Sequence, residues 1–188
     1  MSSVKQFNYK LLHKYGEDVF ISGNVEIRRP NLVEIGAHVA IDSGFYLTTA
    51  ARIGSYVHIS PYVTCIGGAD AILEMGDFTT LAAGVRLIVL GDEHLGAGLV
   101  GPVIPDPYKD RLVGGKIKLE KFAAVGTSSI LMPGVTMAEG SVLGAGSLLN
   151  RDTEPWTIYV GTPAQAIKKR DSKKMIEFAN EIEKLNPH

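Results

Sequence analysis

The chain has 188 residues, a formal net charge of −1 and an apolar fraction of 45%. This length and composition are typical of one soluble domain with a sizeable core, and the balanced charge argues against nucleic acid as a partner. The single cysteine, Cys65, excludes a disulfide within the chain and favours a reducing compartment. Without a signal-peptide core or an apolar run of about 18 residues, the sequence predicts a cytoplasmic protein that does not insert into membranes.

Residues 1–18 precede any regular pattern. Their larger apolar side chains are few: Phe7, Leu11, Leu12 and Tyr15. We expect this segment to pack across the first turn of a repeat domain that spans residues 19–170. Val19 and Val25 indicate an early, less regular turn of that domain.

From residue 35 onward, apolar residues recur every six positions, in three runs that differ in phase. We call them anchors: Ile35, Ile41, Leu47, Ile53, Ile59 and Cys65; Met75, Leu81 and Leu87; Leu119, Val125, Leu131, Met137, Leu143 and Leu149. Four positions after most anchors stands a residue of small or moderate size: Val39, Phe45, Ala51, Val57, Val63, Ala69, Thr79, Val85, Ala123, Ser129, Val135, Ser141, Ser147 and Thr153.

A period of six fits neither an α-helix, with about 3.6 residues per turn, nor a lone alternating strand. It fits a very short strand followed by a corner, repeated many times. The anchors would then point inward and stack over their equivalents in the next turn, because no turn can bury its apolar face alone. The pattern therefore predicts an all-β solenoid.

Two interruptions break the repeat. Four extra residues fall between Gly67 and Glu74, and a longer stretch, from about 91 to 118, is rich in glycine and proline. The second stretch predicts an excursion loop that leaves the solenoid. Long loops on rigid scaffolds often carry function, and His94 stands near the start of this one.

Residues 171–188 also leave the repeat. Met175, Phe178, Ile182 and Leu185 recur at helical spacing, and either Asp171 or Ser172 can serve as the N-cap. We expect an amphipathic helix over residues 171–186 that covers the last turn of the solenoid or packs on a neighbouring subunit.

Two C-terminal segments carry a family resemblance. The run ILMPGVT at 130–136, followed by GAGS at 144–147, and the ending YVGTPA at 159–164 resemble the hexapeptide-repeat acyltransferases. The resemblance covers roughly residues 19–170. It implies a left-handed parallel β-helix, acetyl-CoA as co-substrate, no metal, and a homotrimer with active sites between subunits. The left hand rests on the resemblance alone, because right-handed crossovers are the physical default.

The order of parts is similar to the galactoside and maltose acetyltransferases. It is more similar still to acyltransferases of O-antigen and capsule sugar pathways, some of which acylate nucleotide-linked amino sugars. The resemblance therefore implies transfer of an acetyl group to a sugar in surface-polysaccharide biosynthesis. It leaves open whether a hydroxyl or an amine is acylated, and how long the acyl chain is.

The resemblance assigns the catalytic base to His94, because the family histidine stands at the start of the excursion. The family pattern there is Gly-His-Pro, whereas this chain reads GDEHL at 91–95, without the proline and with two added acids. A neutral imidazole would take the acceptor's proton, and a backbone N–H would stabilise the oxyanion. Asp92 and Glu93 either orient the imidazole and bind sugar hydroxyls, or are solvated loop acids.

His58 and Ser60 are weaker candidates for acceptor binding. Ser60 stands where the galactoside enzymes use an asparagine, and His58 either faces the acceptor of a neighbouring subunit or serves a structural role at its corner. Cys65 occupies an anchor position and should point inward as a small apolar residue, which argues against an acyl-enzyme.

The resemblance places CoA along the C-terminal turns, at Ala124, Thr127 and Ala145. The family has a tryptophan at the position of Ala124. The basic residues Arg151, Lys168, Lys169 and Arg170 either meet the CoA phosphates or form a solvated stretch that leads into the helix.

Two other functions remain open on this fold. A zinc hydratase of the γ-carbonic-anhydrase type needs three histidines that meet at the metal, whereas His38, His58 and His94 are far apart in the sequence. A non-catalytic scaffold is the other alternative. The excursion favours an enzyme, and its apolar residues Leu99, Val100, Val103, Ile104 and Tyr108 favour a partner subunit that covers them.

Overall fold

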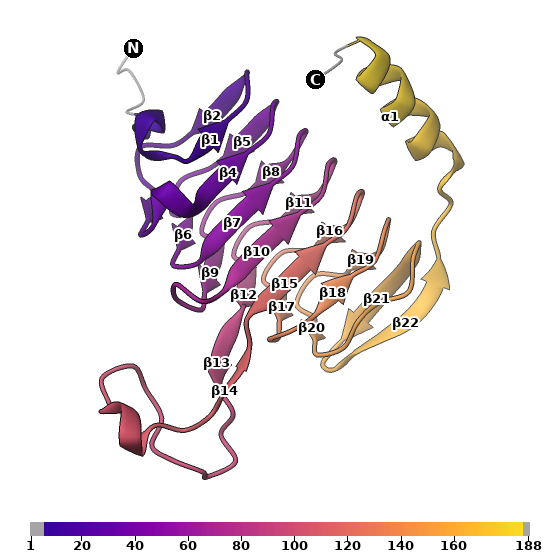
Figure 1. Ribbon diagram of the computed structural model, residues 1–188. Coiled ribbons are helices and arrows are strands. Elements are labelled where there is room, and N and C mark those ends of the chain that lie inside the picture. Colours follow the sequence, from indigo (N-terminus) through magenta and orange to yellow (C-terminus); the bar gives the residue numbers. More distant parts are fainter. Residues whose placement is uncertain (1–5, 186–188) are drawn as a thin grey trace.

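The computed structural model describes residues 6–185, which form a parallel β-solenoid of about seven turns with one C-terminal helix (Figure 1). The predicted solenoid is confirmed. Each regular turn contributes one strand to each of three sheets, which we call the first, second and third faces in chain order. The first corner joins the first face to the second, the second corner joins the second to the third, and the third corner leads into the next turn.

The strands of the three faces are short, as the six-residue period requires. The first face contains β1 (Lys14–Tyr15), β4 (Val33–Ile35), β7 (Ala50–Ile53), β10 (Ile72–Met75), β15 (Lys116–Leu119) and β18 (Thr136–Met137). The second face contains β2 (Val19–Ile21), β5 (Val39–Ile41), β8 (His58–Ile59), β11 (Thr80–Leu81), β16 (Ala124–Val125), β19 (Val142–Leu143), β21 (Thr157–Gly161) and β22 (Ala164–Lys169). The third face contains β3 (Glu26–Ile27), β6 (Tyr46–Leu47), β9 (Thr64–Ile66), β12 (Arg86–Ile88), β17 (Ile130–Leu131) and β20 (Leu148–Leu149).

The remaining elements lie outside this regular pattern. They are the hairpin strands β13 (Leu90–Asp92) and β14 (Leu112–Gly114), the 3₁₀ turns η1 (Tyr9–Leu11), η2 (Pro30–Leu32) and η3 (Asp106–Tyr108), and the helix α1 (Lys173–Leu185).

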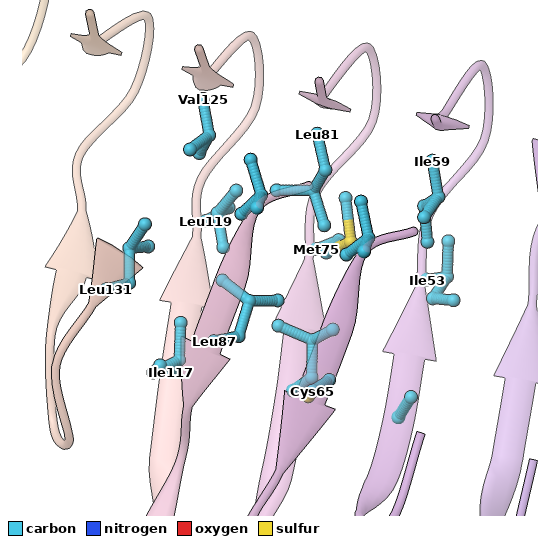
Figure 2. Close-up of a cluster of buried hydrophobic side chains, with 14 of the residues drawn as sticks. Ile53, Ile59, Cys65, Met75, Leu81, Leu87, Ile117, Leu119, Val125 and Leu131 are labelled. Carbon is cyan, nitrogen blue, oxygen red and sulfur yellow. The ribbon is translucent and has the colours of Figure 1, made fainter. Parts of the chain in front are cut away.

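The core is a column of stacked anchors. Parallel pairing places Ile35 beside Ile53, Ile53 beside Met75 and Met75 beside Leu119, and Figure 2 shows such side chains pointing into the prism from successive turns. Every predicted anchor is at most 4% exposed. The corner residues are buried as well except Ala69, for which the prediction is wrong. The extra residues of the first interruption push Ala69 outward, and Ala71 fills the core position instead.

The first corner carries a stack of rings. His38, Tyr56, Phe78 and Phe122 occupy equivalent positions in four successive turns. Gly140 holds that position in the next turn and Trp156 in the turn after it, and all six have left-handed backbone, with φ between 52° and 66°. Neighbouring ring centroids lie 4.7, 4.8, 5.5 and 5.6 Å apart, within the range of favourable aromatic contact. The turns also approach closely here, since a Cβ on Gly54 would lie 2.8 Å from the backbone nitrogen of Asp77.

The solenoid begins earlier than the sequence analysis placed it. Residues 14–15 already form β1 of the first face, paired with β4. Of the predicted N-terminal cover, Phe7 packs on the core and Leu12 is buried, whereas Leu11 and Tyr15 are about half exposed. The first five residues of that segment, and residues 186–188, lie outside the described part of the chain.

The C-terminal helix is confirmed, its predicted inward face is partly wrong, and it does not cover the last turn. The alternative, packing on a neighbouring subunit, stays a prediction. The strand β22 turns back antiparallel on β21 and covers the edge of the second face. Helix α1 instead leads away from the last turn (Figure 1), and Glu183 pairs with Lys121 at 2.5 Å. Ala179 is the buried residue of the helix, whereas Phe178 and Leu185 are 55% and 79% exposed.

Candidate active site

Counted from the N-terminus, the first five turns have all their interruptions of the repeat at the third corner. Equivalent anchors that flank the third corner are six positions apart at Leu47 and Ile53, but eight apart at Ile27 and Ile35 and ten apart at Cys65 and Met75. The long excursion leaves from the third corner after β12 and returns into β15. The irregular backbone therefore lies along one edge of the solenoid, the third corner, and a site can form there.

These segments line a cavity of about 630 Å³. Its solenoid wall comes from Arg28, Arg29, Thr48, Ile66, Gly67, Gly68 and Ile88, and its excursion wall from Leu90, Gly91, Asp92, His94, Gly101, Pro102, Lys109 and Leu112. The cavity thus has an apolar lining with a few polar and charged groups, as small-molecule sites usually do.

The excursion is closed at its root and projects from the solenoid (Figure 1). Strands β13 and β14 pair antiparallel, and the backbone N–H of Gly115 donates to the carbonyl of Val89 at 2.8 Å. Farther out, Leu99 and Lys109 form an isolated bridge. The hairpin holds both ends of the loop wall against the third corner.

His94 directly follows this hairpin and lines the cavity with an exposed side chain. Its backbone is left-handed, with φ of 62°, and its N–H donates to Oδ2 of Asp110 at 2.9 Å. The other oxygen of Asp110 accepts from the N–H of Arg111 at 2.8 Å, and Asp110 is only 5% exposed. Asp110, which the sequence analysis missed, therefore fixes the backbone that presents the imidazole.

The two acids before His94 separate. Asp92 lines the cavity with His94, whereas Glu93 does not. The backbone N–H of Glu93 pairs with the carbonyl of Arg111 at 2.8 Å. Since neighbouring side chains of a strand point to opposite sides, this alternation leaves Asp92 as the acid that shares the cavity with His94.

The structure does not bring His58 and Ser60 to this cavity within one chain. His58 lies on the outer surface of the second face, and its Nε2 is 2.9 Å from Oδ2 of Asp42. Ser60 follows at the second corner, where its N–H donates to the carbonyl of Leu81 at 2.9 Å. Their contact with an acceptor stays a prediction that needs a neighbouring subunit.

The three positions predicted for CoA lie around the second corner. Thr127 and Ala145 are exposed at this corner in neighbouring turns, where Gly146 donates its N–H to the carbonyl of Thr127 at 2.8 Å. Ala124 lies on the adjoining second face, between Thr80 and Val142. The structure thus places these residues in one region, and their role in binding stays a prediction.

The predicted basic cluster is dispersed. Lys169 pairs with Glu154 at 2.8 Å, and Arg170 donates to the carbonyls of Phe122 and Gly140 at the first corner. Lys168 lies on β22, and Arg151 is exposed after β20 at the third corner. Lys169 and Arg170 therefore have structural partners, which leaves Arg151 and Lys168 as the better candidates for phosphate contacts.

Cys65 is fully buried, as its anchor position predicts, and burial raises the pKa of its thiol to about 12. Among residues 6–185, no three His, Cys, Asp or Glu side chains are placed to hold a metal ion. The histidines considered for zinc lie apart, with His38 at the first corner, His58 on the second face and His94 on the excursion. No helix in the described part of the chain is long and apolar enough to cross a membrane.

Comparisons with known proteins agree with this geometry, although no protein-family model matches the sequence. The dTDP-4-amino-4,6-dideoxy-D-glucose acyltransferase of Escherichia coli is 30% identical over 179 residues, covering 93% of this chain and 89% of the relative. A variant of AntD, an N-acyltransferase from Bacillus cereus, was solved with dTDP-4-amino-4,6-dideoxyglucose and coenzyme A. It is 33% identical, with a TM-score of 0.90 over 97% of this chain and 98% of that chain.

A third structure matches at the level of the fold. The hexapeptide-repeat acetyltransferase VCA0836 from Vibrio cholerae has a TM-score of 0.56 at 17% identity, over 86% of this chain and 73% of that chain. The chain belongs to the hexapeptide-repeat acyltransferases, and it is an acyltransferase with the left-handed parallel β-helix predicted from the resemblance. The relatives that match it over most of its length include one enzyme named for an amino sugar linked to dTDP and one solved with such a sugar.

Proposed function

We propose that this acyltransferase moves an acyl group, acetyl by default, from acyl-CoA to the amine of a nucleotide-linked amino sugar. The observation that carries the proposal is the AntD match over nearly the whole chain, in a structure that holds coenzyme A and dTDP-4-amino-4,6-dideoxyglucose together. The cavity at the third corner supports it, because its volume and its mixture of apolar and charged groups suit a sugar nucleotide. The choice between hydroxyl and amine, open in the sequence, is thereby narrowed to an amine.

The proposed chemistry is direct transfer. A sugar amine is protonated near neutral pH and must lose a proton before its nitrogen can attack the thioester carbon. In this scheme the imidazole of His94 accepts that proton, and a carbon–nitrogen bond forms as the amine attacks. The carbon–sulfur bond then breaks, and a second proton passes from the attacking nitrogen to the sulfur, so that CoA leaves as the thiol. Asp92, in the same cavity, binds the ammonium or a sugar hydroxyl and positions the acceptor.

A steady-state assay tests the proposed function. Release of the CoA thiol from acetyl-CoA should require both the enzyme and dTDP-4-amino-4,6-dideoxyglucose, and the sugar product should gain the mass of one acetyl group. Calorimetry should show saturable binding of acetyl-CoA near one site per chain. If acetyl-CoA does not bind at millimolar concentration, the transferase assignment fails and the result favours a non-catalytic scaffold.

The assignment of the base has its own prediction. His94→Ala should lower kcat by about 100-fold, the usual range for losing a positioned general base, while the Kd for acetyl-CoA stays within twofold. His13→Ala is the control, since His13 is exposed and lies outside the cavity. Turnover of His94→Ala near the wild-type rate would show that the proton leaves by another route, for example directly to the departing thiolate.

We also propose that the protein is a homotrimer. Several apolar residues of the excursion lie open in the single chain, among them Leu95 at 80% and Val103 at 89% exposure. Surfaces of this kind usually pack against a partner, and a neighbouring excursion or solenoid face would bring His58 and Ser60 nearer to a cavity. Light scattering tests the assembly, and a monomeric mass at micromolar concentration contradicts it.

The place of the enzyme in the cell is a proposal of the same kind. A free buried thiol at Cys65 fits a reducing compartment such as the cytoplasm. An N-acylated, nucleotide-linked sugar is an activated donor, and we propose that surface-polysaccharide biosynthesis, such as that of an O-antigen, consumes it. Loss of the N-acyl sugar from the cell's polysaccharide after deletion of the gene tests this, and unchanged polysaccharide contradicts it.

A further inference from the structure

Arg29 stands out among the basic residues at the cavity. It is half-buried, and its Nη1 donates to the carbonyl of Thr48 at the third corner of the next turn, at 2.5 Å. The hydroxyl of Thr48 in turn accepts from the N–H of Gly67 at 3.1 Å. The backbone carbonyl of Thr48, a residue that is itself hydrogen-bonded to the following turn, therefore holds this guanidinium in place, which limits the entropy lost when a ligand binds it.

The positive charge of Arg29 has no carboxylate partner. Within residues 6–185 it forms no ion pair, whereas Arg28 pairs with Glu26 at 2.8 Å and Lys109 pairs with Asp106 at 2.7 Å. A guanidinium has five N–H donors, and the bond to Thr48 uses one of them. Since Arg29 lines the cavity, its free donors and its charge favour an anion there. The planar fork of arginine suits phosphate oxygens in particular.

The height of Arg29 along the solenoid agrees with one kind of anion. Its guanidinium lies at the level of Thr48, and the excursion leaves the same corner two turns later. Strands of neighbouring turns are about 4.8 Å apart, so this separation is roughly 10 Å. From the glycosidic oxygen of a hexose to a nitrogen on C4 are five bonds of about 1.5 Å, hence about 6 Å in space. With a hydrogen bond of about 3 Å at each end, a sugar diphosphate spans the distance from Arg29 to the root of the excursion.

We propose that Arg29 binds the diphosphate of the nucleotide-linked acceptor, with Lys109 contributing from the excursion wall. The inference rests on the proposed function and adds the residue that selects for the nucleotide. CoA also carries a diphosphate, but the positions predicted for CoA lie at the second corner of later turns, around Thr127 and Ala145. Arg29 lies on the opposite side of the excursion, in the N-terminal turns.

Calorimetric binding of dTDP to the full-length protein tests this without any turnover. Arg29→Met should weaken dTDP about 30-fold, as expected for loss of charge-assisted hydrogen bonds. Arg29→Lys, which keeps the charge but loses the fork, should weaken it about fivefold. The Kd for coenzyme A should change less than twofold in both variants. Arg52→Met is the matched control, because Arg52 is an exposed arginine on the first face that pairs with Glu74, and it should leave both constants unchanged.

Three results would overturn the inference. In the first, the wild-type protein does not bind dTDP at millimolar concentration. In the second, Arg29→Met binds dTDP as tightly as the wild type. In the third, Arg29→Met loses binding of coenzyme A instead of dTDP. Thermal melting of each variant shows whether it is folded, and Arg29→Lys carries the test if the methionine variant is not. If the variants bind dTDP as predicted but the enzyme transfers no acyl group to any sugar nucleotide, the proposed function is rejected and this inference is not. Acyl transfer with unaltered dTDP binding by Arg29→Met would reject only this inference.

Discussion

The first and third corners of the solenoid are built from the same repeat but have opposite characters. At the first corner, five ring residues in left-handed conformation stack along the solenoid at centroid separations of 4.7 to 5.6 Å. At the third corner, turns one to five include three insertions, and these line the cavity with His94. The stacked first corner keeps the same length in every turn, whereas the third corner accepts extra residues.

The two corners therefore differ in role, since the first stabilises the fold and the third carries the site. Ring stacking at the first corner repeats one favourable contact from His38 to Trp156 and ties these turns together. The third corner contributes less to that regular packing and is free to carry irregular loops. Changes at the third corner should therefore remove activity with little effect on stability, and changes at the first corner should do the reverse.

The largest effect should come from removing the excursion. Residues 91–113 can be replaced by Asn-Gly, because Leu90 and Gly114 are already antiparallel partners and this dipeptide favours a tight hairpin. Turnover should fall at least about 1,000-fold with the loss of Asp92 and His94. The free energy of unfolding in urea should change by less than about 2 kcal/mol, since shortening a surface loop costs little. Activity within tenfold of wild type, or collapse of the solenoid, would contradict the comparison.

A substitution in the ring stack should have the opposite result. Phe122 is 5% exposed and lies between Phe78 and Trp156, so Phe122→Ala should lower the free energy of unfolding by about 3–5 kcal/mol. Turnover per folded molecule at 25 °C should stay within about twofold. Tyr62→Ala is a matched control, because Tyr62 has the same left-handed backbone at the second corner but is 66% exposed. It should cost less than about 1 kcal/mol. Equal losses in the two variants would show that the stack adds nothing.

The smallest effect should come from the charged surface of the first face, which belongs to neither corner. A hydrogen bond from Lys116, together with the charges of Lys116 and Arg52, holds the pKa of Glu74 below its usual value. Glu74→Gln should therefore cost about 0.5–1 kcal/mol at pH 7. Because the folded-state pKa is depressed, this contribution is present above the unfolded pKa and is lost as the pH falls through the folded one.

Urea unfolding at pH 7 and at about pH 3 measures that dependence. The difference between wild type and Glu74→Gln should shrink at the lower pH. Glu34→Gln is the control on the same face, because the one ion pair of Glu34 in the described residues is a 3.8 Å contact with His13. An undiminished difference at acid pH would mean that Glu74 acts through packing instead of charge.

Much of the fold could be predicted because the six-residue period records the geometry directly. Each anchor, from Ile35 to Leu149, points into the core because strand and corner lengths repeat. The helix was located by its spacing, but its inward face was not. Spacing selects the largest apolar residues, such as Phe178, whereas Ala179 is the residue buried in the structure. The position of the helix depends in part on the ion pair between Lys121 and Glu183. These residues are 62 positions apart, so local sequence does not predict the position.

The site was only partly predictable. The long Gly- and Pro-rich interruption located the excursion and His94, but Arg29 and Asp110 were missed. A signal for Arg29 did exist, because Ile27 and Ile35 are eight residues apart instead of six. When three strands are counted to each turn, this longer step falls at the same corner as the excursion. Asp110 gave no comparable signal, because its role depends on a hydrogen bond to His94 across a fold of the loop.

The excursion leaves between the fourth and fifth of about seven turns, far from both ends of the solenoid. In a linear array each turn contacts only its neighbours, so opening begins at the ends and spreads inward one turn at a time. The root of the excursion is then among the last places to open, and its amide hydrogens should exchange with solvent more slowly than those of β1 or β22. Fraying at either end would leave the geometry around His94 intact, whereas fraying of the first turn would also displace Arg29.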